Sequence, residues 1–247
     1  MRTIRLWLIQ IATILSLIVW AMLDLQFESL VRSMRSIIVD PGTTVQSTTQ
    51  LVGSMRPVFL LVIVSVGFLS LAMLTVNIFR STKGLQSRSI ASLLAITTTI
   101  AVWCGLAINY PSLAWQGKRL RVAIQVQQLE HFVQPLRDEW PRVDGELPEI
   151  GPFMAYPFGR PITLILLEPP ALSGTGLCVS AIERGADGSI RLQLSSIGHD
   201  DWAQWHPVGS RPKSFVGGLG NTYDLQSTTP LARGWYLVRY NSRSIDA

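Results

Sequence analysis

The densest group of residues that could perform chemistry is the segment GHDDWAQWHP, which places His199, Asp200, Asp201 and His206 within eight residues. Imidazole and carboxylate groups are the usual zinc ligands and general bases, so a small membrane-bound hydrolase or metal enzyme is one hypothesis. Paired histidine ligands usually share one side of a helix or hairpin, whereas these two lie seven residues apart. The segment is more typical of a polar turn in which Asp201 caps a short helix over 202–205.

The two cysteines and the glycine-rich segment give no sign of catalysis. Cys104 lies in an apolar run, and Cys178 lies in a predicted strand without an activating base beside it. Because Cys178 is the only cysteine of the C-terminal half, that half cannot form an internal disulfide. Segment 215–223 lacks the preceding strand and following helix that a phosphate-binding loop requires. The sequence therefore predicts no cofactor site and no metal site, and it favours a non-enzymatic protein over an enzyme.

Aromatic side chains are concentrated in the C-terminal half and suggest a different kind of site. Some must belong to the core, but others lie in the Pro- and Gly-rich stretch GPFMAYPFGRP, which is expected to cross the surface in turns. Exposed aromatic rings are typical of surfaces that bind a protein or glycan partner. The candidate partner-binding residues are Phe153, Tyr156, Phe158, Trp202 and Trp205.

Three apolar runs precede the C-terminal half of the chain and would hold it in place. They cover residues 6–23, 57–79 and 90–109, and each is close to the roughly 20 residues that cross a hydrocarbon core as a helix. None contains Asp, Glu, Lys, Arg or His. Since proton and ion pathways nearly always need ionisable groups inside the bilayer, the runs are predicted to be a transmembrane anchor. The mean hydropathy of +0.31 agrees with a membrane protein.

The first run could also be a signal peptide, because Arg2 and Arg5 precede it. No small-residue cleavage site follows directly, so an uncleaved anchor is the preferred interpretation. The next segment, 24–56, begins with apolar residues at helical spacing and carries Glu28 and Arg32 at i, i+4. We expect either a continuation of the first helix or a separate amphipathic helix on the membrane interface, followed by a polar linker.

Basic residues near the ends of the runs predict the orientation in the membrane. With the N-terminus inside, five bases lie in two short inner segments and six lie outside. These counts do not decide the orientation. However, the first helix usually determines it, and bases in short loops have more influence than those in the long segment 24–56. We predict a multi-pass protein with a cytoplasmic N-terminus and an extracytoplasmic C-terminal domain, and the reverse orientation is the alternative. The inner bases are Arg2, Arg5, Arg80, Lys83 and Arg88, and the outer bases are Arg32, Arg35, Arg56, Lys118, Arg119 and Arg121.

The charge is unevenly distributed. Residues 1–117 hold eight Arg or Lys and three Asp or Glu, whereas residues 118–247 hold thirteen of each kind. The overall charge of +5 therefore belongs to the membrane region. A neutral C-terminal half offers no basic field for a polyanion, so no nucleic-acid partner is expected.

Residues 118–247 are predicted to form a small soluble α+β domain. Apolar residues from Val122 to Trp140 recur at helical spacing, and Pro135 is expected to kink this helix or to end a first segment near Gln134. About four strands of a mainly antiparallel sheet follow. They comprise 162–168, a hairpin over 177–196 that turns at Asp187 and Gly188, and 234–241.

The predicted fold is thus three transmembrane α-helices followed by one amphipathic helix and a mainly antiparallel sheet. The preferred functional hypothesis is a membrane-anchored, non-enzymatic module that binds a protein partner or serves as an accessory subunit of a membrane complex. Its expected partners are the lipid bilayer and a membrane or envelope protein. The alternative is the hydrolase or metal enzyme built on His199, Asp201 and His206.

Overall fold

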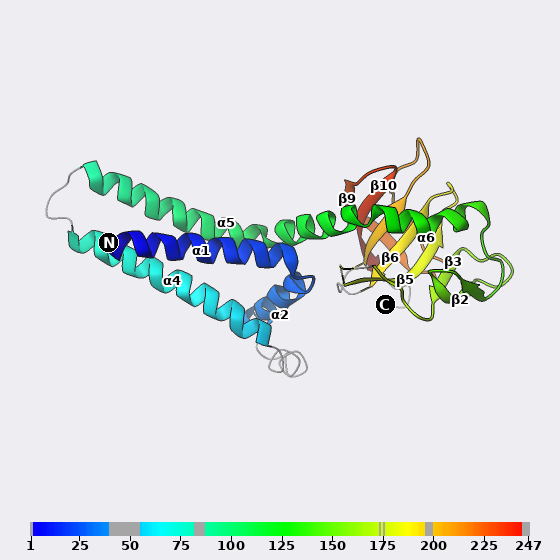
Figure 1. Ribbon diagram of the computed structural model, residues 1–247, viewed down its shortest axis with the longest axis horizontal. Helices are drawn as coiled ribbons and strands as arrows, with labels where there is room; N and C mark the ends of the chain where they lie inside the picture. Colours follow the sequence, from blue (N-terminus) through cyan, green and yellow to red (C-terminus); the bar gives the residue numbers. More distant parts are fainter. Residues whose placement is uncertain are drawn as a thin grey trace. The chain divides into compact units, whose positions relative to one another are not determined.

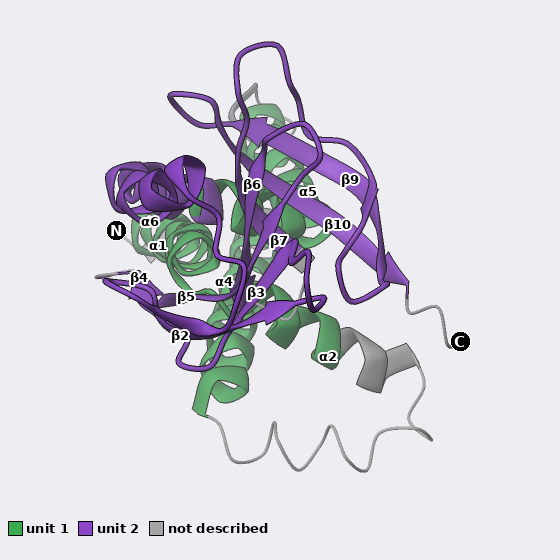
Figure 2. Cartoon of the chain, turned by 90° about the vertical axis from the view of Figure 1, so that its right-hand side faces the viewer, with its two compact units in different colours: residues 1–117 green, residues 118–247 purple. Residues whose placement is uncertain are grey.

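The chain forms two compact units in a computed structural model that describes residues 2–39, 55–81, 87–172, 174, 176–195 and 200–243. The first unit is Met1–Gly117 and the second is Lys118–Ala247. Figure 2 colours the two units separately, and each is described by itself below.

The first unit is helical. It contains α1 (Arg2–Leu23), α2 (Phe27–Val39), α4 (Met55–Ser81) and most of α5 (Ser87–Ile124). Helices α1, α4 and α5 are long and apolar enough to cross a bilayer, with candidate spans Ile4–Leu23, Met55–Asn77 and Ile90–Ile124. These spans confirm the prediction of three long apolar helices, and they indicate a membrane protein. Helix α5 runs past the predicted apolar run and contains Pro111.

A sharp corner joins α1 to α2 (Figure 1). Asp24 forms it, because its carboxylate accepts the backbone N–H of Gln26 at 2.9 Å and the indole N–H of Trp20 at 2.9 Å. Helix α2 then turns its apolar face, with Phe27 and Leu30, into the buried cluster of the first unit. Of the two alternatives predicted after the first run, the separate amphipathic helix is therefore present.

The second unit packs helix α6 (Val126–Asp138) on a twisted antiparallel sheet. Ten strands lie in the described part of the chain, in the order β1-β2-β3-β5-β6-β7-β10-β9-β8, with β4 paired to β5. The strands are β1 (Gly145–Leu147), β2 (Gly151–Tyr156), β3 (Thr163–Leu166), β4 (Ala171–Leu172), β5 (Leu177–Arg184), β6 (Ile190–Ser195), β7 (Asp200–Trp205), β8 (Phe215–Val216), β9 (Thr222–Pro230) and β10 (Trp235–Arg243).

One face of the sheet is covered by α6 (Figure 1). The helix buries an apolar stripe at 3.6-residue spacing. Two polar contacts fix its position: the indole N–H of Trp235 donates to Glu130 at 2.7 Å, and the Arg137 guanidinium lies 3.7 Å from the centre of the Trp205 ring. The stripe consists of Val126, Leu129, Val133 and Leu136.

Local predictions differ from the structure in three places. Segment 202–205 is part of strand β7 rather than a short helix capped by Asp201, because both faces of this strand are covered and its polar residues hide the two-residue alternation. Residues 151–156 were expected to cross the surface in turns, but they form strand β2.

Of the two outcomes expected at Pro135, a kink or the end of a first segment near Gln134, the second is not found. The helical stripe is interrupted at Gln125, between α5 and α6, and α6 continues through Pro135 to Asp138.

Candidate functional site

Asp201 lies fully buried in β7, where two cations contact its carboxylate. Lys118 Nζ donates to Oδ2 at 2.7 Å, and Arg239 donates to Oδ1 through Nε at 2.7 Å and to Oδ2 through Nη2 at 3.1 Å. Burial alone would raise the pKa of Asp201, but hydrogen bonds from Arg239 and the charge of Lys118 lower it below its ordinary value. Since cations occupy both oxygens, this carboxylate stabilises the fold and is poorly placed to act as a base.

His206 follows β7 and belongs to a chain of buried and half-buried polar groups. Its Nδ1 lies 2.9 Å from Ser210 Oγ, and Ser210 donates in turn to Asp187 Oδ2 at 2.5 Å. On the other side of the ring, Nε2 lies 3.1 Å from Gln204 Oε1. The Gln204 amide continues the chain by donating to the Tyr240 hydroxyl at 2.9 Å. The chain thus links the turn after β7 to the turn between β5 and β6.

Burial sets the protonation states in this chain. The His206 side chain is 1% exposed, and desolvation lowers its pKa to about 4, although the nearby Asp187 carboxylate acts in the opposite direction. Desolvation would raise the pKa of Asp187, but hydrogen bonds from Ser189 and Ser210 hold it well below its usual range. At neutral pH, His206 is therefore uncharged and Asp187 is ionised.

The order of groups differs from that of a nucleophilic triad. Such a triad places the histidine between the serine and the carboxylate, so that the imidazole can take the serine proton. Here Ser210 lies between His206 and Asp187, and its hydroxyl hydrogen points to the carboxylate. The arrangement anchors segment 207–210 to the hairpin turn at Asp187, which is a structural role.

A second buried polar group lies on the same sheet face. Glu183 and Arg191 pair across β5 and β6 and are only 5% and 6% exposed. Glu183 accepts hydrogen bonds from Thr163 Oγ1 at 3.3 Å and from the backbone N–H of Gly218 at 3.2 Å, and burial raises its pKa. The Arg191 guanidinium lies 3.9 Å from the centre of the Phe215 ring. These contacts hold segment 215–218 on the sheet, as expected of a packed core.

The structure does not bring the predicted catalytic candidates together. The Asp201 side chain lies on the face of β7 that α6 covers, and it contacts Lys118 there. His206 instead contacts Gln204, whose side chain lies on the opposite face of β7. His199 lies outside the described residues. Within the described ranges, no group of three His, Cys, Asp or Glu side chains is close enough to hold a metal ion.

The five candidate aromatic residues fall into two environments. Phe153 and Trp202 are 4% and 1% exposed and belong to the core, and Trp205 lies beneath the Arg137 guanidinium. Tyr156 and Phe158 are 44% and 94% exposed. Only these last two of the five are available to a partner as large exposed rings.

Tyr156 and Phe158 are two of four exposed apolar residues around the turn from β2 to β3, which we name the β2–β3 tip. The turn beneath it is well ordered by hydrogen bonds, because the Ile162 backbone N–H donates to the Tyr156 carbonyl at 2.9 Å and the Trp140 indole donates to the Pro161 carbonyl at 2.8 Å. The tip consists of the exposed side chains of Met154, Tyr156, Phe158 and Ile162.

A polar groove adjoins the tip and shares Ile162 with it. Three arginines line the groove, and the Arg184 guanidinium lies 5.8 Å from the centre of the Trp140 ring. Asp138 and Glu139 supply two carboxylates, so arginine is in excess. The three arginines are Arg142, Arg160 and Arg184.

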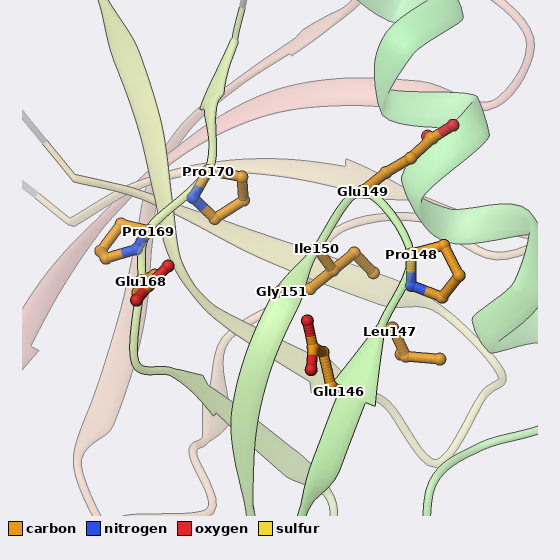
Figure 3. Close-up of a pocket in the computed structure, with 9 residues that line it drawn as sticks. All are labelled: Glu146, Leu147, Pro148, Glu149, Ile150, Gly151, Glu168, Pro169 and Pro170. Atoms are coloured by element: carbon orange, nitrogen blue, oxygen red, sulfur yellow. The ribbon is translucent and has the colours of Figure 1, made fainter.

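A separate open pocket lies between the β1–β2 turn and the segment after β3 (Figure 3). Prolines and three glutamates line it, but Figure 3 shows Glu149 pointing away from Glu146 and Glu168. The carboxylates therefore do not converge on one point, and the pocket has no apparent ligand chemistry of its own.

No protein-family model, curated protein or solved structure matches this chain. Sequence patterns had identified Asp187 only as a turn residue and had given no signal for Ser210, Gln204 or Tyr240, since these side chains meet through tertiary pairing.

Proposed function

We propose that the protein is a membrane-anchored, non-enzymatic module that binds a protein partner through its β2–β3 tip, as an accessory subunit of a membrane complex. The observation that carries the proposal is the 94% exposure of Phe158 on a hydrogen-bonded turn. Clustered exposed apolar side chains are typical of interaction sites, and an ordered turn loses little conformational entropy when it binds.

The groove beside the tip suggests the chemistry of the partner. Arginine and aromatic residues dominate the energetics of protein interfaces, and both kinds occur here. Because Arg142, Arg160 and Arg184 outnumber the two carboxylates of the groove, the partner should place acidic side chains around an apolar pocket that receives Phe158. In the proposed orientation the domain is extracytoplasmic, so this partner is a membrane or envelope protein.

Photo-crosslinking tests the proposal in intact membranes. A benzophenone amino acid at position 158 should give a discrete crosslinked protein, and the same group at Val208, which is also fully exposed, should not. Phe158→Ser should abolish co-purification of that protein in mild detergent, whereas Val208→Ser should retain it. Isolation of the wild-type chain as a monomer without crosslinks at position 158 would contradict the proposal.

The orientation is tested separately by cysteine accessibility. Cys104 and Cys178 are replaced, and single cysteines are introduced at Ser87 and Val208. An impermeant thiol reagent applied to intact cells should label position 208 and not position 87. The reverse pattern would place the domain in the cytoplasm and move the expected partner there.

The hydrolase alternative is favoured only by the 2.9 Å contact between His206 and Ser210. Hydrolysis of model esters that is lost in both His206→Ala and Ser210→Ala, in variants that remain folded, would support it. Metal analysis of the purified wild-type chain tests the alternative that the protein is a metal enzyme.

A further inference from the structure

A cavity of about 360 Å³ lies among the helices of the first unit. Helices α1, α2, α4 and α5 all contribute to its lining, and among the lining residues none is ionisable at neutral pH. The volume falls in the usual range for ligand sites, roughly 300–1,000 Å³. Any group that occupies this cavity must be apolar.

The cavity is long and narrow. Its lining runs from Leu60 to Leu71 along α4 and from Ile100 to Leu113 along α5, which at helical rise corresponds to about 16 to 20 Å. The hydrocarbon core of a bilayer is roughly 30 Å thick, so one leaflet contributes about 15 Å. The cavity therefore has the length of one acyl chain.

A hydrogen-bonded cluster lies beside the end of the cavity that Leu71 and Trp103 line. Gln10 Nε2 donates to the Gly67 carbonyl at 2.6 Å and to Ser70 Oγ at 2.7 Å, and Gln10 Oε1 accepts the Trp103 indole N–H at 3.0 Å. These polar groups satisfy one another across three helices. Gln10, Gly67 and Ser70 do not line the cavity, so its wall stays apolar beside this cluster.

The opposite end lies at the corner between α1 and α2, where the accessible charge is positive. Arg32 pairs with Glu28 at 3.3 Å, and Arg56 lies 3.8 Å from Asp24. The arginine side chains are 57% and 48% exposed, whereas their carboxylate partners are only 3% and 14% exposed, so a lipid headgroup would meet the guanidinium groups first. Arg32 follows Val31, a lining residue, and Arg56 lies one helical turn before Leu60. Guanidinium groups form strong, charge-assisted hydrogen bonds with phosphate oxygens, so these side chains favour an anionic lipid headgroup.

We propose that this cavity binds an anionic phospholipid of the bilayer, with one acyl chain between α4 and α5 and the phosphate beside Arg32 and Arg56. The site is independent of the β2–β3 tip. It would make a bound lipid part of the packing of the first unit, since Phe27, Leu60 and Trp103 contribute to both the cavity wall and the buried cluster.

The test uses the full chain in phosphatidylcholine nanodiscs that contain a trace of phospholipid with a photoactivatable acyl chain. Ala107 lines the cavity and is exposed to it, so Ala107→Phe should fill the space without disturbing the fold. Ala101 is also exposed on α5 but does not line the cavity, so Ala101→Phe is the matched control. Cys104→Phe provides a second filling variant. Circular dichroism and gel filtration show which variants are folded.

We expect phosphatidylglycerol adducts on residues 60–71 and 100–113, reduced about fivefold or more by a filling variant and unchanged by Ala101→Phe, where fivefold corresponds to roughly 1 kcal/mol. Equal adduct yields from filling and control variants would overturn the proposal. So would equal labelling of the wild type by phosphatidylcholine and phosphatidylglycerol probes. Double replacement of Arg32 and Arg56 by Gln should remove that preference. Displacement of a co-purifying protein by Ala107→Phe, with no bound lipid in the wild type, would instead identify a partner helix as the occupant.

Discussion

Lys118 and Asp201 form a buried ion pair, with 2.7 Å between Nζ and Oδ2, although 83 residues separate them in the chain. Arg239 contacts the same carboxylate at 2.7 Å. One anion therefore pairs with two cations inside the second unit. Removing that anion should be far more harmful than removing a surface charge.

Asp201→Asn should destabilise the second unit by about 3–5 kcal/mol, because two poorly solvated cations lose their partner. Denaturant unfolding of the detergent-solubilised chain, followed by tryptophan emission, measures the effect. Asp224→Asn is the control, since Asp224 and Arg243 form an ion pair with side chains 47% and 74% exposed. Its expected cost is less than about 1 kcal/mol, and equal losses in the two variants would contradict the assignment.

His206 should make the fold sensitive to mild acid. Its folded-state pKa of about 4 lies below the ordinary value of 6.5, so the unfolded chain binds a proton first as the pH falls. The contribution of His206 to the free energy of unfolding is therefore fully present above pH 6.5, and it is lost as the pH falls from 6.5 to about 4. In this window the wild type should lose up to roughly 3 kcal/mol more than His206→Gln. Parallel stability curves for the two proteins would show that His206 titrates normally.

Gly67 should tolerate no side chain. A Cβ placed there would lie 2.4 Å from the Trp103 ring, whereas a Cβ at Gly105 would meet nothing within 4 Å. We expect Gly67→Ala to destabilise the helical unit by about 1–3 kcal/mol through overpacking. Gly105→Ala should be neutral or stabilising by up to about 1 kcal/mol, because alanine favours helix. Thermal unfolding of both variants in one detergent makes the comparison.

Phe158 should contribute almost nothing to stability, in contrast to Phe153 only five positions away. Phe158→Ala should change the free energy of unfolding by less than about 0.5 kcal/mol, as expected for an exposed site. Phe153 is 4% exposed, and Phe153→Ala should cost about 3–5 kcal/mol. A large loss of unfolding free energy in Phe158→Ala would mean that the ring packs against the domain itself and is not free to bind a partner.

The helices were predictable because their signals are local. Runs of apolar residues identify α1, α4 and α5, and the repeat from Val126 to Leu136 identifies α6. Strand β7 was missed because Asp201 and Gln204 are buried polar residues, which replace the usual alternation with a pattern typical of a turn. Their partners come from distant strands and from α5, and no local rule identifies such partners.

The candidate site was predictable only in part, for the same physical reason. Dense Pro and Gly residues favoured surface turns throughout this stretch, and a turn holds the exposed Phe158, but residues 151–156 form strand β2. Phe153 lies in the same stretch, but strand alternation turns its ring toward the core. Whether an aromatic ring is buried depends on which face of the strand a neighbour covers, and this neighbour is far away in the sequence.

The position of β10 affects the order in which the sheet can form. This strand pairs with β7 on one side and with β9 on the other, and through β9 it holds β8. During synthesis, the β8–β9 hairpin consequently has no strand to join until residues 235–243 leave the ribosome. Until then one edge of β7 has unpaired backbone groups, beside residues such as Trp202 and Ala203 that are buried in the folded domain. Strand β10 thus closes the sheet only after β7 and β9 have been made. Until then the unfinished domain would depend on chaperones or on fast folding to avoid pairing with other chains.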